Sequence, residues 1–291
     1  MKNKQSKNYV FIGITLAILI LYTVVMGLMV YMTIITSLKD FLDYKLNPIG
    51  LPEIWMWSNY VDAFSAFNVI LDGGRKVVYL DTMLLYSLIY AAGSAFISAT
   101  VPALVAYLVA KYRVWLNEFI YGTVIVAMVL PIVGALPSEI QVAKFLGIYN
   151  TLYGVWIMKA TYLGTNFLIY YGTFKGLSDE YIEAATIDGA GQFTVMLQVV
   201  LPLVKTTIFA IMILAFIGSW NDYQTPLIYM QDYPTAAVGL FRYVYMPSQA
   251  GAATSNMQMA GCMILFIPVL ILFLIFRDVF MGNLTVGGLK G

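Results

Sequence analysis

The residue types that carry most enzyme chemistry are nearly absent from this chain. It contains no histidine, which excludes Ser–His triads, HExxH zinc sites and haem ligation by histidine. The single cysteine, Cys262, cannot form an internal disulfide or a paired-cysteine metal site. No GxxxxGK(S/T) phosphate-binding loop occurs, so another chain must bind any ATP that powers the protein. We therefore expect no catalytic residue, no metal ligand and no cofactor-binding residue in this chain.

The polar residues that remain are suited to binding and docking rather than to bond chemistry. They are the segment 176–202, Lys159 and Asn166 within one apolar stretch, and Trp220-Asn221-Asp222 at the end of another. Each of these groups needs a scaffold to position it. The composition indicates what that scaffold is.

The whole chain has the composition of a membrane protein. Of its 291 residues, 61% are hydrophobic and 11% are charged, and the mean hydropathy is +0.82. A soluble domain carries about 25% charged residues, which is far more than this chain offers. The net charge of +1 excludes electrostatic binding of nucleic acid. We expect a polytopic protein whose partners include membrane lipid and exclude nucleic acid.

Charge-free apolar runs predict where the spans lie, because a charge at the bilayer centre costs about 2.5–3.5 kcal/mol. A helix needs about 20 residues to cross the hydrocarbon. No alternating pattern typical of a transmembrane barrel is present, so the predicted fold class is all-α, in a single domain over residues 1–291. The first run is too long for a signal peptide and is expected to be a retained span. The six predicted spans lie near 10–36, 84–110, 119–137, 152–174, 204–221 and 257–276.

The distribution of basic residues predicts that both chain ends lie on the inner side of the membrane. With the N-terminus inside, the loop 175–203 between spans four and five and the tail 277–291 are also inside. Nine basic residues then lie inside, namely Lys2, Lys4, Lys7, Lys111, Arg113, Lys175, Lys205, Arg277 and Lys290. Six lie outside, namely Lys39, Lys45, Arg75, Lys76, Lys144 and Arg242.

The inner loop 175–203 has the pattern of a small helix–turn–helix. Ser178 is a suitable N-cap, and the two acidic residues after it favour the first helical turn. Asp188-Gly189 is a stop-and-turn signal. A second helical segment is expected from Gln192 to Pro202, where the proline bends the chain into span five. On these features alone, the loop is either an amphipathic connector at the membrane interface or a docking element.

The same loop resembles the "EAA" motif of ATP-binding-cassette importer permeases, and in particular the carbohydrate-importer version. The similar residues are Glu183-Ala184-Ala185, Gly189 six residues after the glutamate, and Val199-x-Leu201-Pro202. Three weaker segments are also similar to the maltose-permease G-type subunits: Ser58-Asn59-Tyr60 with Phe64, Trp220-Asn221-Asp222-Tyr223 with Pro226-Leu227, and the C-terminal Leu284-Thr285-x-Gly287-x-x-Lys290-Gly291. Valine at position 199 replaces the commoner isoleucine, and Asn283 replaces a common glycine.

The resemblance implies a function and a set of partners. It implies a permease subunit of a bacterial cytoplasmic-membrane carbohydrate importer, working with a second homologous permease, two cytoplasmic ATPase subunits that bind ATP and Mg, and an extracytoplasmic solute-binding protein. It implies that Glu183, Ala184, Ala185, Asp188 and Gly189 form the coupling helix that docks on the ATPase. It also implies that the tail residues Leu289, Lys290 and Gly291 reach the ATPase.

Two other functions stay open at this point. One is an importer of the same class for another solute, such as a polyol, glycerol phosphate or peptide. The other is a secondary transporter that works without ATP. Secondary transporters usually carry acidic residues within the membrane, and the charge-free spans of this chain hold none.

The intramembrane polar residues each have a structural and a functional interpretation. Lys159 is either a snorkelling side chain or a cation that faces the solute pathway. Asn166 is either an interhelical hydrogen-bonding residue or a ligand group. At Trp220-Asn221-Asp222, the tryptophan is either part of an aromatic belt, or the segment contacts the external binding protein or lines the outer gate.

Overall fold

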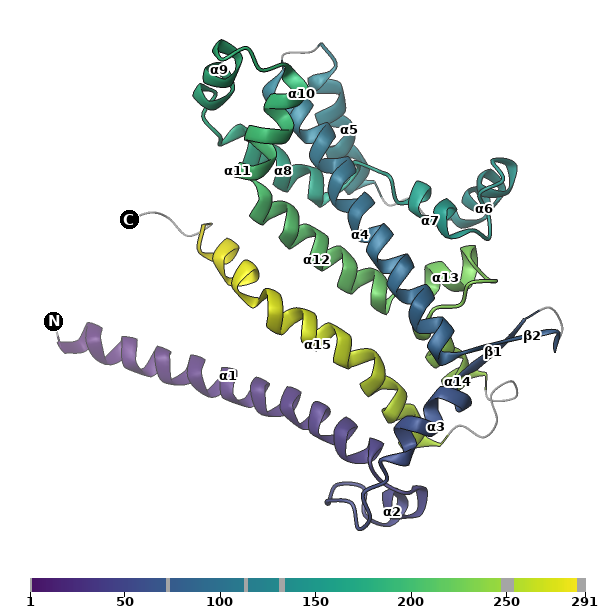
Figure 1. The fold of residues 1–291 in the computed structure, drawn as a ribbon. Coiled ribbons are helices and arrows are strands. Elements are labelled where there is room, and N and C mark those ends of the chain that lie inside the picture. The colour runs from purple at the N-terminus through teal and green to yellow at the C-terminus, as the bar shows by residue number, and fades with distance from the viewer. Residues whose placement is uncertain (1, 72–73, 113–114, 131–133, 247–253, 287–291) are drawn as a thin grey trace.

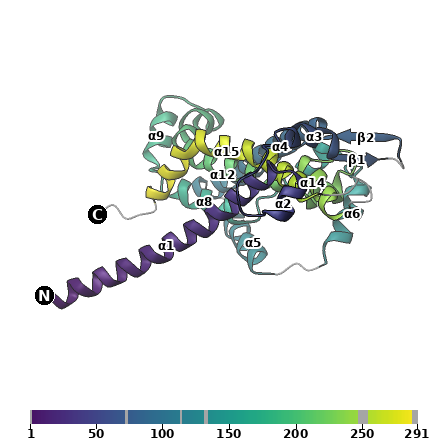
Figure 2. The ribbon, with the colours of Figure 1, turned by 90° about the horizontal axis from the view of Figure 1, so that it is seen from below.

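Helices account for most of the computed structural model, which describes residues 2–71, 74–112, 115–130, 134–246 and 254–286. Four long helices, α1 (Lys2–Ser37), α4 (Leu80–Lys111), α12 (Lys205–Asn221) and α15 (Ser255–Val286), run along the molecule (Figure 1). Helix α9 (Glu180–Ile187) lies toward the same end as the start of α1 and the end of α15. Helices α2 (Phe41–Leu46), α3 (Ser58–Ala66) and α14 (Ala236–Tyr245) lie toward the opposite end, as Figure 2 also shows.

Helix α4 is the centre of the core and packs against both α12 and α8 (Thr165–Lys175). One face of α4 carries small side chains three or four residues apart. This spacing places them on a single stripe, and small residues let neighbouring helix backbones approach closely. The buried members of the stripe are Ala91, Ser94, Ala95, Ala99, Ala103 and Ala106.

A glycine on α4 lets α7 (Leu152–Met158) pack against it. A Cβ atom built at Gly93 would lie 2.2 Å from Cε2 of Trp156, which is far inside van der Waals contact. The indole Nε1 of Trp156 donates a hydrogen bond to the carbonyl of Tyr90 at 3.3 Å. The Trp156 ring therefore occupies the space that a side chain at position 93 would need.

Helix α1 is fixed mainly at its C-terminal end. Its side chains between residues 11 and 31 are exposed, and α15 is its main helical neighbour. The Asn59 side-chain amide donates to the carbonyls of Ser37 and Lys39, both at 2.9 Å, and the Tyr60 hydroxyl lies 2.7 Å from Ser37 Oγ. The motif Ser58-Asn59-Tyr60 therefore ties the end of α1 to α3.

The prediction of an all-α chain was wrong for the segment between α3 and α4, which contains a β-hairpin. Strands β1 (Asn68–Leu71) and β2 (Lys76–Tyr79) pair antiparallel, with Val69 opposite Val78. Val69 and Val78 are buried against α3, α14 and the start of α4. The signals were the apolar runs on either side of the glycine pair at 73–74, and Gly74 adopts a φ of +106°.

The prediction of one helix over 119–137 was also wrong. Helix α5 spans Asn117–Val129 and a separate helix, α6, spans Leu136–Phe145. Leu130 is extended, with φ −78° and ψ 117°. The next residue is Pro131, whose ring disfavours the helical conformation of the residue before it. The proline thus ends α5 earlier than its apolar composition predicts.

The prediction of one continuous helix over 152–174 was wrong as well. The structure divides this stretch into α7 (Leu152–Met158) and α8 (Thr165–Lys175). Between them the chain is non-helical, and Gly164 has a φ of +145°, which L side chains rarely adopt. Hydropathy reports the apolar character of the stretch but contains no information on this backbone break.

The other predicted spans form helices. The predicted ranges 10–36, 84–110 and 257–276 lie within α1, α4 and α15, and 204–221 matches α12, which begins one residue later at Lys205. Among the described residues, three helices are long and apolar enough to cross a membrane. A fourth is possible if the bent pair Gln192–Leu203 and Lys205–Asn221, which meet at 75°, counts as one span. The predicted bend before span five is therefore confirmed.

Candidate functional site

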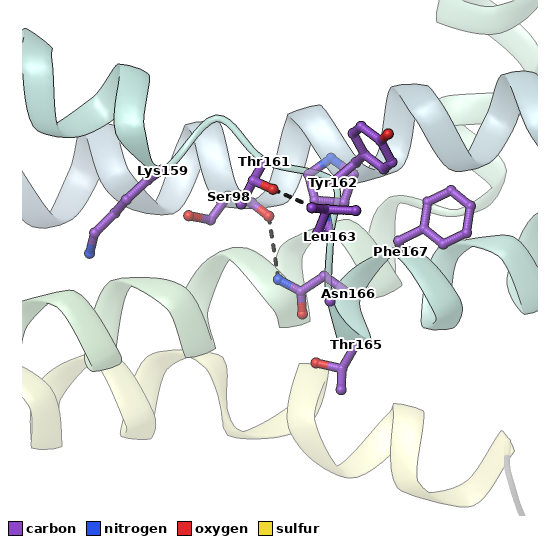
Figure 3. Close-up of a pocket in the computed structure, with 10 residues that line it drawn as sticks. Ser98, Lys159, Thr161, Tyr162, Leu163, Thr165, Asn166 and Phe167 are labelled. Carbon is purple, nitrogen blue, oxygen red and sulfur yellow. Dashed lines mark hydrogen bonds between the residues drawn. The ribbon is translucent and has the colours of Figure 1, made fainter. Parts of the chain in front are cut away.

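The break between α7 and α8 lines a cavity of about 210 Å³. Figure 3 shows Lys159 at one end of the cavity and Phe167 at the other. Ser98 of α4, Thr161 of the break and Thr165 at the start of α8 supply hydroxyl groups to the lining. The break thus places hydroxyl groups and a lysine beside the central helix α4. A continuous helix in place of α7 and α8 would present only the side chains of one of its faces to α4.

Lys159 points into the protein and pairs with Asp222. Its Nζ lies 3.1 Å from Ser219 Oγ and 3.7 Å from Asp222 Oδ2, and it sits 4.8 Å from the centre of the Tyr90 ring. The Lys159 side chain is only 24% exposed. The ammonium group is therefore held between α4 and the end of α12, which favours a cation that faces the protein interior over a snorkelling side chain.

Asp222 is the acceptor at the centre of this polar cluster. Its Oδ2 accepts a hydrogen bond from the Tyr90 hydroxyl at 2.8 Å, and its Oδ1 accepts one from the Thr225 backbone N–H at 3.0 Å. The cluster therefore joins α4, α12 and the α7–α8 break through one carboxylate. Buried charges persist only when they are paired in this way.

The two residues before Asp222 have different surroundings. Trp220 is 4% exposed, and its indole Nε1 donates to the carbonyl of Leu265 on α15 at 3.1 Å. It is a packing residue rather than a member of an exposed aromatic belt. Asn221 is exposed, and its side-chain amide donates to the carbonyl of Ile217 within α12.

Asn166 forms the interhelical hydrogen bond that one interpretation predicted. Its Nδ2 donates to the carbonyl of Ser98 at 3.4 Å, which links α8 to α4. It also lines the cavity beside Lys159 (Figure 3). The bond uses one amide hydrogen and leaves Oδ1 with no hydrogen bond to any residue that the structure describes.

The inner loop forms a second site at the end of the bundle. Helix α9 carries Glu183, Ala184 and Ala185, and of these only Ala185 is partly buried. Ser178 Oγ accepts a hydrogen bond from the Glu180 N–H at 3.3 Å, close to the predicted cap. After Asp188, Gly189 adopts a φ of +84°, which reverses the chain toward α10 (Gln192–Val195).

A buried lysine that the sequence did not single out holds this loop in place. Lys111, at the end of α4, donates to the carbonyl of Leu177 at 2.7 Å and to Asp179 Oδ1 at 2.6 Å. Its side chain is 4% exposed, whereas that of Asp179 is 73% exposed. The only feature of the sequence that could have indicated this anchor is the place of Lys111 at the end of a predicted span. Other basic residues on the inner side have the same kind of position, so the feature does not distinguish Lys111.

The remaining sequence predictions fall outside these two sites. Leu289, Lys290 and Gly291 lie outside the described residues. Within the part of the chain that the structure describes, no group of three or more Cys, Asp or Glu side chains could hold a metal ion.

Comparison with known proteins decides the family. Residues 100–285 match the family described as "Binding-protein-dependent transport system inner membrane component". The chain belongs to this family. The resemblance to importer permeases that the EAA motif indicated is therefore confirmed. The prediction of an inner-membrane protein with apolar helices is confirmed as well.

Individual relatives match almost the whole chain. The chain is 25% identical to the diacetylchitobiose uptake system permease protein NgcG of Streptomyces coelicolor, over 95% of this chain and 88% of that protein. It is 26% identical to the melibiose/raffinose/stachyose import permease protein MelC of Bacillus subtilis, over 90% of each. It is 27% identical to the sn-glycerol-3-phosphate transport system permease protein UgpE of Pectobacterium atrosepticum, over 81% and 82%.

A solved structure shares the fold. A chain of a bacterial ABC transporter involved in the import of the acidic polysaccharide alginate superposes with a TM-score of 0.71 and 18% identity. The match covers 92% of this chain and 96% of that one. The helical arrangement in Figure 1 is thus the fold of an ABC permease.

Proposed function

We propose that this chain is one of two permease subunits of an ATP-driven importer that carries a carbohydrate across the bacterial cytoplasmic membrane. The observation that carries the proposal is the exposed helix α9 with Glu183-Ala184-Ala185, anchored by the buried Lys111 in a chain of this family. The relatives named as permeases for diacetylchitobiose and for melibiose, raffinose and stachyose support a sugar as the solute.

A second candidate solute is glycerol phosphate. The relative UgpE, named for sn-glycerol 3-phosphate, matches at a similar identity to the sugar permeases. It favours glycerol phosphate over a polyol or a peptide as the alternative. A secondary transporter is not favoured, because the family works with binding proteins.

Helix α9 would serve as the coupling helix. Tyr181 and Ile187 of α9 and Phe193 of α10 have 53%, 86% and 70% of their surface exposed, and together they offer an apolar surface for docking. Glu183 would bind a basic or polar group of the ATPase, and the small Ala184 and Ala185 would allow close backbone approach. Asp188 and Gly189 would set the turn, and Leu289, Lys290 and Gly291 would reach the ATPase from the tail.

The partners follow from this role. The chain would pair with a second homologous permease, two ATPase subunits that hold ATP and Mg, and an external solute-binding protein. It would cross the membrane six times with both ends inside, the third crossing being interrupted after α5 and the fourth at the α7–α8 break. Closure of the ATPases would move α9 and the helices attached to it as a rigid body.

The cluster at the α7–α8 break would contribute to the solute pathway. Lys159 and Asn166 would face the solute from the cavity. Asp222 would hold Lys159 in place, while Trp220 and Asn221 would position the end of α12 near the outer gate. Broken helices that expose polar groups at membrane depth are a recurrent device of transporter sites.

A mild-detergent pull-down of the tagged chain, with mass spectrometry and uptake of labelled sugars, tests the proposal. We expect a Walker-motif ATPase and a second EAA-bearing permease to copurify. The variant Glu183→Lys should remain abundant but lose transport and solute-stimulated ATPase activity. Glu118→Lys, a charge reversal at the start of α5 where Glu118 is also exposed, is the matched control and should retain both.

Two outcomes contradict the proposal. Recovery of the chain alone, with uptake that survives ATP depletion and collapses with the ion gradient, would indicate a secondary transporter. Transport at the wild-type rate by the Glu183→Lys variant would contradict the assignment of α9 as the coupling helix.

A further inference from the structure

A second cavity, of about 400 Å³, lies between the end of α12, α14 and α15. It shares no lining residue with the cavity beside Lys159. The helix α14, which lines it, lies toward the end of the molecule opposite α9 (Figure 1). Cavities that bind small molecules measure about 300–1,000 Å³, so this one is within that range and the Lys159 cavity is below it. The lining residues that matter here are Asn221, Tyr223, Phe241, Tyr245, Gln258 and Met259.

Three aromatic rings form one wall of this cavity. The rings of Tyr223 and Phe241 stack with centroids 4.5 Å apart and planes at 13°. Tyr245 follows one helical turn later on α14, with its centroid 5.0 Å from that of Phe241. The Tyr245 side chain is 71% exposed, so the end of the row is open. Because Tyr223 and Phe241 cover each other's facing sides, the open ring of the row is Tyr245, and the negative face of such a ring attracts the weakly positive C–H groups on the face of a sugar ring.

Two side-chain amides supply the polar part of the lining. The Gln258 amide makes no hydrogen bond to any residue that the structure describes, although it lines the cavity. Asn221 uses one amide hydrogen on the carbonyl of Ile217, which leaves its Oδ1 as an acceptor. An amide both donates and accepts hydrogen bonds, and sugar hydroxyls require the same of their partners.

The charge of the lining narrows the class of ligand. Among the residues that the structure describes, no lysine, arginine, aspartate or glutamate lines this cavity. An anionic group such as a phosphate would therefore find no counter-charge here. A lipid acyl chain would cover the aromatic wall but would leave the Gln258 amide unpaired in an apolar setting, which is costly.

We propose that this cavity is a subsite for a neutral sugar ring, with the Tyr223–Phe241–Tyr245 row as stacking wall and Gln258 as hydrogen-bonding partner. The assignment rests on the proposed function and names the ligand class, an uncharged pyranose unit. The subsite would hold the solute at the outer end of the chain, before it reaches the α7–α8 break.

Site-specific labelling tests the occupancy directly. In a Cys262→Ser background, Met259→Cys places the one thiol of the chain in this cavity, and its reaction with N-ethylmaleimide is followed in membranes that contain the complete transporter. The probes are melibiose, raffinose, stachyose and diacetylchitobiose. A sugar that binds should slow labelling about threefold at twice its dissociation constant, because the empty fraction falls as 1/(1 + [L]/Kd).

A matched control lies one helical turn away. Met263 lines a different cavity, beside Val30 and Phe266 of α1 and α15, so Met263→Cys should label at the same rate with and without sugar. Sn-glycerol 3-phosphate should protect neither thiol. Absence of protection by all four sugars, equal protection of both thiols, or protection by glycerol phosphate would each overturn the subsite.

Transport kinetics give a second readout that does not depend on labelling. Gln258→Leu should raise the KM for sugar uptake about threefold to tenfold, as expected for one lost hydrogen bond, with the maximal rate preserved. Gln224→Leu, which changes an exposed glutamine on α13 (Gln224–Tyr229), should leave KM unchanged. An unchanged KM in Gln258→Leu overturns the subsite while leaving the importer function intact. Sugar uptake that continues unchanged in cells lacking this chain would instead contradict the importer function.

Discussion

At the scale of single residues, the largely buried charges of Lys159 and Asp222 stabilise each other. Lys159 and Asp222 come from segments more than sixty positions apart and meet beside Tyr90, each with less than a quarter of its side chain exposed. Desolvation makes each charge costly by itself, so each requires the other. Their joint role is to hold the α7–α8 break against the end of α12.

We therefore expect Lys159 and Asp222 to be energetically coupled. Lys159→Met and Asp222→Leu should each destabilise the protein in detergent, and the double variant should be less destabilised than the sum by about 0.5–3 kcal/mol. Arg277 and Asp278, 3.5 Å apart but 66% and 90% exposed, are the control pair and should show almost no coupling. Additive effects for Lys159 and Asp222, measured by thermal unfolding, would contradict this.

At the scale of elements, the packing of the central helix depends on small side chains. α4 can contact α8 and α12 closely because its buried stripe consists of alanine and serine. The same logic applies to α7, whose Trp156 fits over Gly93. In a lipid environment such close packing provides much of the driving force for helix association.

Gly93→Ala should destabilise the chain by about 1–3 kcal/mol through the clash with Trp156. Trp156→Phe, a smaller ring, should recover part of this loss in the double variant. Gly122→Ala on α5 is the control, because a Cβ there meets nothing within 4 Å and alanine favours a helix. Thermal unfolding in detergent measures all three, and equal stability of the two alanine variants would be inconsistent with the packing argument.

The anchor of α9 is also a property of elements. Lys111→Met removes the bonds to Leu177 and Asp179, and we expect reduced copurification of the ATPase with a folded, abundant chain. Lys175→Met, at the end of α8, removes a basic residue whose Nζ, among the described residues, interacts with Tyr171 of the same helix. It should leave copurification intact. Loss of the ATPase from both variants would indicate a general charge effect instead.

At the scale of the whole molecule, the arrangement separates two ends. The start of α1, the end of α15 and α9 gather at one, and α2, α3, the hairpin and α14 at the other (Figures 1 and 2). The excess of basic residues assigned to the first end is the basis for the proposal that this end faces the cytoplasm.

A pair of single cysteines tests this sidedness. In the Cys262→Ser background, Thr186→Cys on α9 should react with a membrane-impermeant maleimide only in inside-out vesicles. Arg75→Cys, in the loop of the hairpin, should react only in intact spheroplasts. Both positions are exposed, so access across the membrane is the remaining variable. Labelling of both from one side would contradict the proposed topology.

The sequence by itself determined the membrane class, the family and the positions of four long helices. These depend on composition, on charge-free length and on the local spacing Glu183-Ala184-Ala185 to Gly189, all of which survive any change in packing. The bend before α12 was predictable for the same reason, since Pro202 acts on its own backbone.

Only the tertiary structure decided which polar groups meet. The Lys159–Asp222 pair, the Lys111 anchor and the aromatic wall of Tyr223 and Phe241 join residues far apart in the chain, and no local pattern encodes their distance. The break at Gly164 was likewise invisible to hydropathy, because an apolar stretch has the same composition whether its helix is continuous or interrupted. Local chemistry fixes each segment, and packing against α4 fixes where their side chains converge.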